Sequence, residues 1–447
     1  MSHPTLFLLP DPEECLTMST PPPLGRPRLV CPNRRQLEWR EVDIDGLLAE
    51  DHPARTLWAY AERVDLGPVE AGIKSVEGRG GRPVSDRRVL FALWLYATFD
   101  GVGSARRLAK LCTEHNAYIW ICGGVPVDYH LLSDFRTEHA EWLDDLLTES
   151  MATLMEQGLM TLARVSQDGV RVRASAGASS FRRGETLEKC LREAQEQVTT
   201  LRRELESDPG AATRRQARAR QRAVRERAER VRRAIEELPK VGAKRRALGM
   251  KSKSKPRAST TDAEARVMKV PGGGFRPAFN VQFATDTASQ AIAGVAVTNA
   301  GSDAGQMLPM VEQIEQRTGQ TPKEMLADGD FAKKEDIETL AAPPRQVTVY
   351  APVRASKKTE VDPHTPRPSD GPAVASWRQR MATPEAKAIY KERAATAECV
   401  NADVRNHGLY QFLVRGLAKV RAVALWHALV HNVRRILRLC PAAIGLG

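Results

Sequence analysis

Residues 164–172 read RVSQDGVRV and residues 323–331 read KEMLADGDF, and both runs have the pattern of buried strands. In each run, apolar residues lead to an aspartate followed by glycine, which predicts one strand with Asp168 at its end and another with Asp328 at its end. Side chains at the carboxyl ends of strands in an α/β sheet point into the crevice where ligands bind. Asp-Gly is also ordinary turn chemistry, so neither acid alone identifies a site.

The segments around these runs alternate between strands and helices. We expect a hairpin of strands at 279–284 and 291–297, a helix capped at Ser302-Asp303, a strand at 346–353 and a helical region at 384–439. Strands, a hairpin and then alternating helix and strand predict an α/β fold with a mixed sheet.

A basic segment interrupts this order. Residues 181–257 contain 24 Lys and Arg against 11 Asp and Glu, which accounts for the whole chain's net charge of +12. Apolar residues recur at alternating four- and three-residue steps on both sides of Pro209-Gly210, so we expect a hairpin of two helices with a coiled-coil seam. A solvated charged face is one interpretation of this charge, but its density favours polyphosphate binding.

The region before residue 150 predicts only an arm and helices. Residues 1–35 contain three consecutive prolines and no sustained period, which predicts a disordered arm. Helices are expected after Pro53, after Ser85-Asp86 and after Ser104. The last two form a helix–turn–helix outline in a basic context, which is typical of DNA readers but also of any small helical bundle.

Composition excludes several classes of protein. The chain has 447 residues, of which 42% are hydrophobic and 27% charged, an ordinary soluble globular mix. Seven scattered cysteines without a C-x-x-C pair argue against a disulfide framework or a zinc knuckle. The most apolar stretch, 412–439, contains six Lys and Arg, and the N-terminus lacks the features of a signal peptide. We therefore expect a cytoplasmic protein without a membrane span.

Carboxylates are the remaining source of chemistry. The glycine-rich runs at 78–83 and 272–274 lack the Lys-Ser/Thr of a phosphate loop, so no nucleotide cofactor is expected. His427 and His431 lie in an apolar helix without a zinc-protease glutamate, which favours packing. Two aspartates in one crevice would repel each other unless a divalent cation lay between them, and their hard oxygens suit Mg²⁺ or Mn²⁺.

Three motifs carry a family resemblance. They are PGGGFRPAFNVQFATD at 271–286, VTNAGSDAGQM at 297–307 and LADGDF at 326–331. Together with the predicted helices that precede them, these motifs resemble the DDE transposases of bacterial insertion sequences, closest to the eleven-eighty-two group.

The resemblance covers most of the chain and implies its domain organisation. An all-α N-terminal DNA-binding domain would span 36–150. An RNase H-like catalytic domain with a mixed sheet would span 160–183 and 259–440, and the basic coiled-coil insertion would occupy 184–258.

The resemblance also implies the catalytic residues. The first two acids of the family's triad correspond to Asp168 and Asp328. The family's Tyr-Arg-Glu-Lys signature matches Tyr390, Arg393, Glu398 and Arg405, which makes Glu398 the third acid and assigns the other three to DNA binding.

Two positions depart from the family pattern. Arg405 stands where Lys is usual, which keeps the charge and changes its geometry. Asp330 stands where Gly is more typical, so the choice between Asp328 and Asp330 stays open. Helical spacing puts Glu398 and Arg405 two turns apart on one face and leaves Glu398 offset from Arg393. Glu385 and Glu392 are rival acids in a polar helix start.

The expected mechanism is two-metal phosphoryl transfer. Asp168, Asp328 and Glu398 would hold two Mg²⁺ (or Mn²⁺) ions about 4 Å apart, for DNA cleavage followed by strand transfer. The expected partners are the duplex DNA of the element's ends and of the target, and a second copy of the chain in a homodimer on that DNA. This places the protein at the nucleoid of a bacterial cytoplasm. A plain metal-dependent nuclease and a catalytically silent DNA-binding repressor derived from a transposase are the alternatives.

Overall fold

The computed structural model describes residues 35, 43–76, 83–207, 211–247, 255–355 and 362–441, without the side chains of 205–207 and 211–217. Nearly all of the expected arm at 1–35 lies outside this description. The described residues from Ile44 onward belong to one compact unit. Within the described ranges, no helix combines the length and the apolar character needed to cross a membrane.

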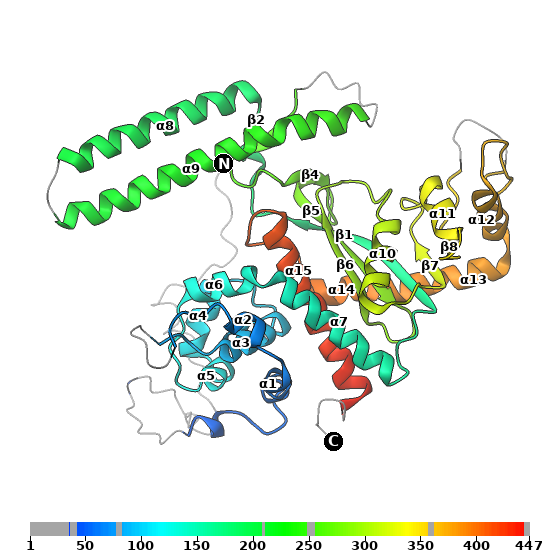
Figure 1. Cartoon of the computed structure of the whole chain (residues 1–447), viewed down its shortest axis with the longest axis horizontal. Helices are drawn as coiled ribbons and strands as arrows, with labels where there is room; N and C mark the ends of the chain where they lie inside the picture. Colours follow the sequence, from blue (N-terminus) through cyan, green and yellow to red (C-terminus); the bar gives the residue numbers. More distant parts are fainter. Residues whose placement is uncertain are drawn as a thin grey trace, which may run out of the picture. The chain divides into compact units, whose positions relative to one another are not determined.

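In the described part of the N-terminal region, the regular elements are all helices (Figure 1). Their bounds are α1 (Pro53–Arg63), α2 (Gly67–Glu70), α3 (Arg87–Phe99), α4 (Ala105–Glu114), α5 (Asn116–Cys122), α6 (Tyr129–Glu138) and α7 (Ala140–Glu156). Side chains cap three of the expected starts, since His52, Asp86 and Ser104 accept hydrogen bonds from backbone N–H groups of α1, α3 and α4. Helix α7 continues past the domain end expected at residue 150.

A six-stranded mixed sheet follows, as expected. Its strands are β1 (Arg164–Arg173), β4 (Arg266–Lys269), β5 (Phe275–Asp286), β6 (Ile292–Thr298), β7 (Glu324–Ala327) and β8 (Thr348–Tyr350). Strand β1 is central: it pairs antiparallel with β5 and parallel with β7, and β7 pairs parallel with β8. Both β4 and β6 pair antiparallel with β5, opposite different parts of it. The sheet is therefore antiparallel on one side of β1 and parallel on the other.

Two hydrophobic cores cover the sheet. One is continuous from the N-terminal helices through α15 (Leu417–Leu439) to sheet residues such as Val170 and Val172. The other joins sheet residues such as Val165 to α10 (Met307–Thr318), α11 (Lys334–Ala341) and α12 (Pro372–Ala382). Because both faces are covered, β5 is buried from Pro277 to Asp286.

The basic segment forms the expected helical hairpin. Helices α8 (Gly184–Ser207) and α9 (Ala211–Ala247) lie side by side in Figure 1. Leu187, Ala194, Ala228 and Val231 are buried along their seam. The short strands β2 (Phe181–Arg182) and β3 (Ala258–Ser259) pair antiparallel where the hairpin leaves and re-enters the chain. The hairpin is thus clamped at its base by backbone hydrogen bonds.

Three expectations about local structure are wrong. Ser302 and Asp303 do not cap a helix: α10 begins at Met307 without a side-chain cap, because the buried Asp303 serves other partners. The strand expected at 346–353 is shorter than expected and consists of β8 alone. The helical region from 384 divides into α13 (Pro384–Arg393), a π-helical turn (Ala394–Glu398), α14 (Cys399–Asn406) and α15.

Candidate active site

The ladder between β1 and β7 sets the position of both aspartates. Its parallel pairs run from Arg164 with Glu324 to Gln167 with Ala327. The next residue on β1 is Asp168 and the next residue after β7 is Asp328, so the two acids lie at the same end of this ladder. Asp168 is within β1 and not at its end as expected, because β1 continues to Arg173 alongside β5.

Asp168 is connected to the helices that follow the sheet. Its Oδ1 lies 3.0 Å from Nη2 of Arg393, and its Oδ2 accepts a 2.9 Å hydrogen bond from Nδ2 of Asn401. Burial raises the pKa of Asp168, the charge of Arg393 counteracts that rise, and the charges of Asp303 and Asp328 add to it. Asp168 is therefore a partly buried acid held between one guanidinium and one amide.

The π-helical turn brings Glu398 to the same guanidinium. Oε1 of Glu398 lies 3.8 Å from Nη1 of Arg393, and the Glu398 side chain is 66% exposed. In a regular α-helix, residues five apart point in different directions, whereas the i to i+5 spacing of a π-helix places them one above the other. The offset expected between Arg393 and Glu398 is thus removed by the turn, and Arg393 reaches both acids.

Tyr390 lies in the field of both aspartates. Burial raises the pKa of its hydroxyl, the charge of Arg393 lowers it, and the charges of Asp328 and Asp168 raise it further. Tyr390, Arg393 and the two aspartates are therefore close enough to influence one another.

The rival acids have other partners. Glu392 pairs with Arg164 at 2.5 Å, and Asp330 pairs with Arg354. Glu385 is exposed on the first turn of α13. Asp328 directly follows the last residue of the ladder with β1, and its charge acts on Asp168 and Tyr390, so the geometry fits Asp328 as the second acid.

Helix α14 presents one face to this region. Glu398, Asn401 and Arg405 follow one another at steps of three and four residues, which places them on one helix face. The sequence analysis missed Asn401, although its position one turn after Glu398 was a usable signal. Arg405 lines a hollow of about 490 Å³ together with three further arginines.

The acids provide suitable ligands for a hard cation but are not gathered around one point. Among the residues that the structure describes, no three His, Cys, Asp or Glu side chains lie together as a metal site. Asp168, Asp328 and Glu398 nevertheless supply only carboxylate oxygens, the ligands that Mg²⁺ prefers. Since Arg393 lies against Asp168 and near Glu398, its side chain would have to turn aside for these acids to share an ion.

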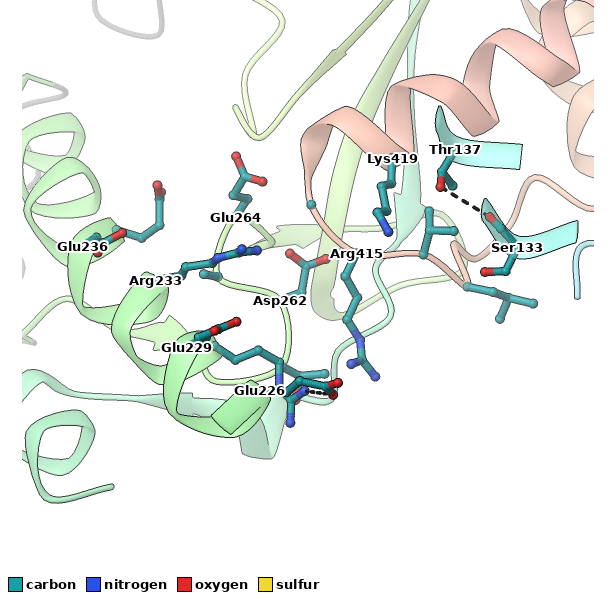
Figure 2. A pocket seen from close by; sticks show the side chains of 17 residues that line it. Ser133, Thr137, Glu226, Glu229, Arg233, Glu236, Asp262, Glu264, Arg415 and Lys419 are labelled. Atoms are coloured by element: carbon teal, nitrogen blue, oxygen red, sulfur yellow. Dashed lines mark hydrogen bonds and ion pairs between the residues drawn. The ribbon is translucent and has the colours of Figure 1, made fainter. Parts of the chain in front are cut away.

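A larger hollow of about 610 Å³ lies where α9 meets the loops after β3 and before α15. Figure 2 shows side chains of both charges around it, including Asp262, Arg233, Arg415 and Lys419. Six acidic and four basic residues line it, so its charge does not suit a phosphate.

Two family models match the chain. One, described as a transposase DDE domain, matches residues 356–437, and the other, described as a transposase domain (DUF772), matches residues 42–138. The first range contains the helices that carry Arg393 and Glu398, whereas Asp168 and Asp328 lie outside both ranges. The resemblance to DDE transposases of insertion sequences is confirmed, without identifying the group within them. No curated protein and no solved structure matches the chain significantly.

Proposed function

The chain carries two segments of transposase families, and on that premise we propose that it is the DNA transposase of an insertion sequence, cutting DNA at the element's ends and joining them to a target. The observation that carries this proposal is the register of β1 and β7. It sets Asp168 beside Asp328, while Arg393 links Asp168 to Glu398.

The strand order supports an RNase H-like catalytic domain. Leaving aside β4, which pairs only with the first part of β5, the order across the sheet is β6-β5-β1-β7-β8. In this set of five strands, the first along the chain carries Asp168 and the fourth is directly followed by Asp328. The third acid then follows on a late helix, which is the placement expected of the family's triad.

The proposed chemistry is a pair of in-line displacements at phosphorus. A water oxygen attacks the phosphodiester at the element's end and the 3′-oxygen leaves. That 3′-hydroxyl then attacks a phosphodiester of the target, joins to its phosphorus and displaces the target strand's own 3′-oxygen. Asp168, Asp328 and Glu398 would hold two Mg²⁺ or Mn²⁺ ions, which activate the attacking oxygen and stabilise the leaving one. Tyr390, Arg393 and Arg405 would hold the strand being cut.

The N-terminal helices and the hairpin would bind the rest of the DNA. Arg106, Arg107 and Lys110 are exposed on α4, where a duplex can reach them. The exposed arginines of α9 offer a second basic surface. We further propose that the protein acts as a homodimer on duplex DNA, at the nucleoid of a bacterial cytoplasm.

Cleavage of a labelled duplex carrying the element's end, in Mg²⁺, tests this function. We expect Asp168→Asn, Asp328→Asn and Glu398→Gln each to lower cleavage by more than about 100-fold while DNA binding persists, because these acids serve the reaction and not the phosphate backbone. Glu385→Gln is the matched control, since it removes an exposed acid from α13 and should cut like the parent. Near-normal cutting by Asp328→Asn would move the second acid to Asp330.

A second DNA duplex in the same assay separates the alternatives. A transposase joins the cut end to the second duplex, whereas a plain nuclease only cuts the first. A repressor derived from a transposase binds the DNA of the element's end without cutting it, in Mg²⁺ or in Mn²⁺. Absence of joined product from the parent protein would contradict the proposal.

A further inference from the structure

A hollow beside the proposed active site has an unusual charge. It has a volume of about 490 Å³, and four of the residues that line it are arginines: Arg171, Arg173, Arg276 and Arg405. None of its described lining residues is acidic. Four like charges around one hollow repel each other, and an anion placed among them relieves that repulsion.

Three of these arginines have no competing partner within the described residues. Arg171 is held in place by Asp303, whose Oδ2 lies 2.6 Å from its Nη2. For the side chains of Arg173, Arg276 and Arg405, the described part of the chain offers neither an ion pair nor a hydrogen bond. Their guanidinium groups are therefore available to a ligand, and their planar forks suit phosphate.

The hollow also holds an exposed aromatic ring on a rigid support. Tyr410 is 60% exposed and lines the hollow. Its backbone is fixed to the end of β1, because its carbonyl accepts a hydrogen bond from the N–H of Arg173 and Phe412 donates back to the Arg173 carbonyl. An exposed ring on a fixed backbone among arginines is the combination that stacks with bases of a single strand.

The elements that position Asp168 continue into this hollow. Arg173 is five residues beyond Asp168 on β1, or about 17 Å along a strand. Arg405 is one turn beyond Asn401, which donates to Asp168. Because side chains five residues apart on a strand point to opposite faces, the connection to the proposed cleavage site runs through Arg405 and α14, along which a DNA strand in the hollow would reach that site within a few nucleotides.

We propose that this hollow binds unpaired DNA next to the scissile phosphate, with Arg173, Arg276 and Arg405 on consecutive phosphates and a base stacked on Tyr410. The size of the hollow is that of a small-ligand site, which accommodates a nucleotide and not a duplex. The inference rests on the proposed transposase function and adds the form of DNA that this part of the protein recognises.

Binding of a labelled 20-nucleotide single strand and of its duplex to the full chain, in EDTA, tests the proposal. We expect Arg173→Gln/Arg276→Gln to weaken single-strand binding at least tenfold and to reduce the slope of log K against log salt by about 1.4, because each single-strand phosphate contact contributes about 0.7. Duplex binding should change much less. Lys269→Gln/Lys323→Gln is the control, since it removes two exposed charges that do not line the hollow.

The ring is tested separately. Tyr410→Ala should weaken single-strand binding by about fivefold to a hundredfold, and Tyr410→Trp should restore it, because stacking needs an aromatic face and no hydroxyl. An unchanged single-strand affinity and salt slope in Arg173→Gln/Arg276→Gln would overturn the proposal. Equal losses of affinity for duplex and for single-stranded DNA would also overturn it. These binding assays contain EDTA and no divalent metal, so they do not measure cleavage. Their results are therefore independent of the cleavage defect of Asp168→Asn, which tests the transposase function itself.

Discussion

At Asp168, burial and the guanidinium of Arg393 act on the carboxyl group in opposite directions. Burial raises its pKa and Arg393 lowers it. Cleavage needs the ionised acid, so the rate should fall as the pH falls through this pKa. Arg393→Gln removes the lowering charge and should therefore move the acidic limb of the pH–rate profile to higher pH, in addition to lowering the maximal rate.

The control for this shift lies on the same helix. Lys391 is exposed on α13, so Lys391→Gln removes a positive charge that does not contact Asp168. Its acidic limb should coincide with that of the parent in single-turnover cleavage measured across pH. A profile for Arg393→Gln that loses height without moving would mean that Asp168 is not the group whose ionisation limits the rate.

Gly169 leaves the space that a buried polar network needs. A Cβ atom there would lie 2.4 Å from Nε2 of Gln282 and 2.6 Å from Oδ1 of Asp303. Asp303 in turn accepts hydrogen bonds from Asn280, Gln282 and Arg171. We expect Gly169→Ala to lower the free energy of unfolding by about 1–3 kcal/mol, since overpacking forces these partners apart.

Urea denaturation measures that loss, and Gly72 provides the comparison. A Cβ at Gly72 would meet nothing within 4 Å, so Gly72→Ala should leave the unfolding midpoint nearly unchanged. Equal stability of the two variants would show that the network can move aside.

Among the elements, the π-helical turn makes the sharpest prediction. It inserts one residue between Arg393 and Glu398 relative to an α-helical turn, and Ala395 is exposed within it. Deleting Ala395 should convert the turn to regular α-helix and keep both side chains on one face, because they become i and i+4. Deleting Ala394, Ala395 and Thr396 should instead make them i and i+2, which places Glu398 on the opposite face of the helix from Arg393.

Cleavage assays on the two deletions distinguish these geometries. The single deletion should keep cleavage within about tenfold of the parent, whereas the triple deletion should resemble Glu398→Gln. Loss of cleavage in the single deletion, with an unchanged melting temperature, would show that the π-helical geometry itself is required. Each deletion also serves as the other's control for the effect of shortening the chain.

Most elements followed from the sequence because their signals are local. Alternation in 164–173 and the four- and three-residue steps of α8 and α9 depend on neighbouring residues only, and so do the caps at His52 and Asp86. The adjacency of Asp168 and Asp328 also followed, since parallel strands end at one edge. The role of Asp303 did not, because its partners Asn280 and Gln282 are more than twenty residues away. The π-helical turn has no local signal in a run of small residues.

For the whole molecule, the helical N-terminal region and the sheet share a core through α15. This helix packs against α7 and β6, and Asp403 of α14 binds it through Arg434 at 2.7 Å and His431 at 2.8 Å. Although burial raises the pKa of Asp403, hydrogen bonds with His431 and Arg434, aided by the charges of these groups, hold this pKa well below its ordinary value. The helix that carries Asn401 and Arg405 is therefore braced by the element that also supports the N-terminal helices.

The hairpin can be shortened without disturbing this assembly. Its base is fixed by Leu187, Val231 and the pair of Glu237 with Arg266, and Ala194 and Ala228 are buried one step farther out. Replacing residues 197–225 by a short turn preserves this packing and removes eight arginines against three acids. We expect an unchanged melting temperature, weaker binding to duplex DNA and a smaller salt slope, by about 0.9 for each phosphate that the shortened chain no longer neutralises.

A charge-only variant decides how the outer hairpin acts. Arg218, Arg220, Arg222 and Arg225 are exposed on α9, and changing all four to Gln removes charge at full length. If the outer hairpin binds phosphates, this variant should lose affinity and salt slope in the same direction as the shortened chain. If the outer hairpin instead binds a second copy of the protein, the Gln variant should bind DNA like the parent. The shortened chain should then lose assembly on DNA, which the mass of the protein–DNA complex measures. Because the surface is arginine-rich and its seam is already filled by its own two helices, we expect the first result.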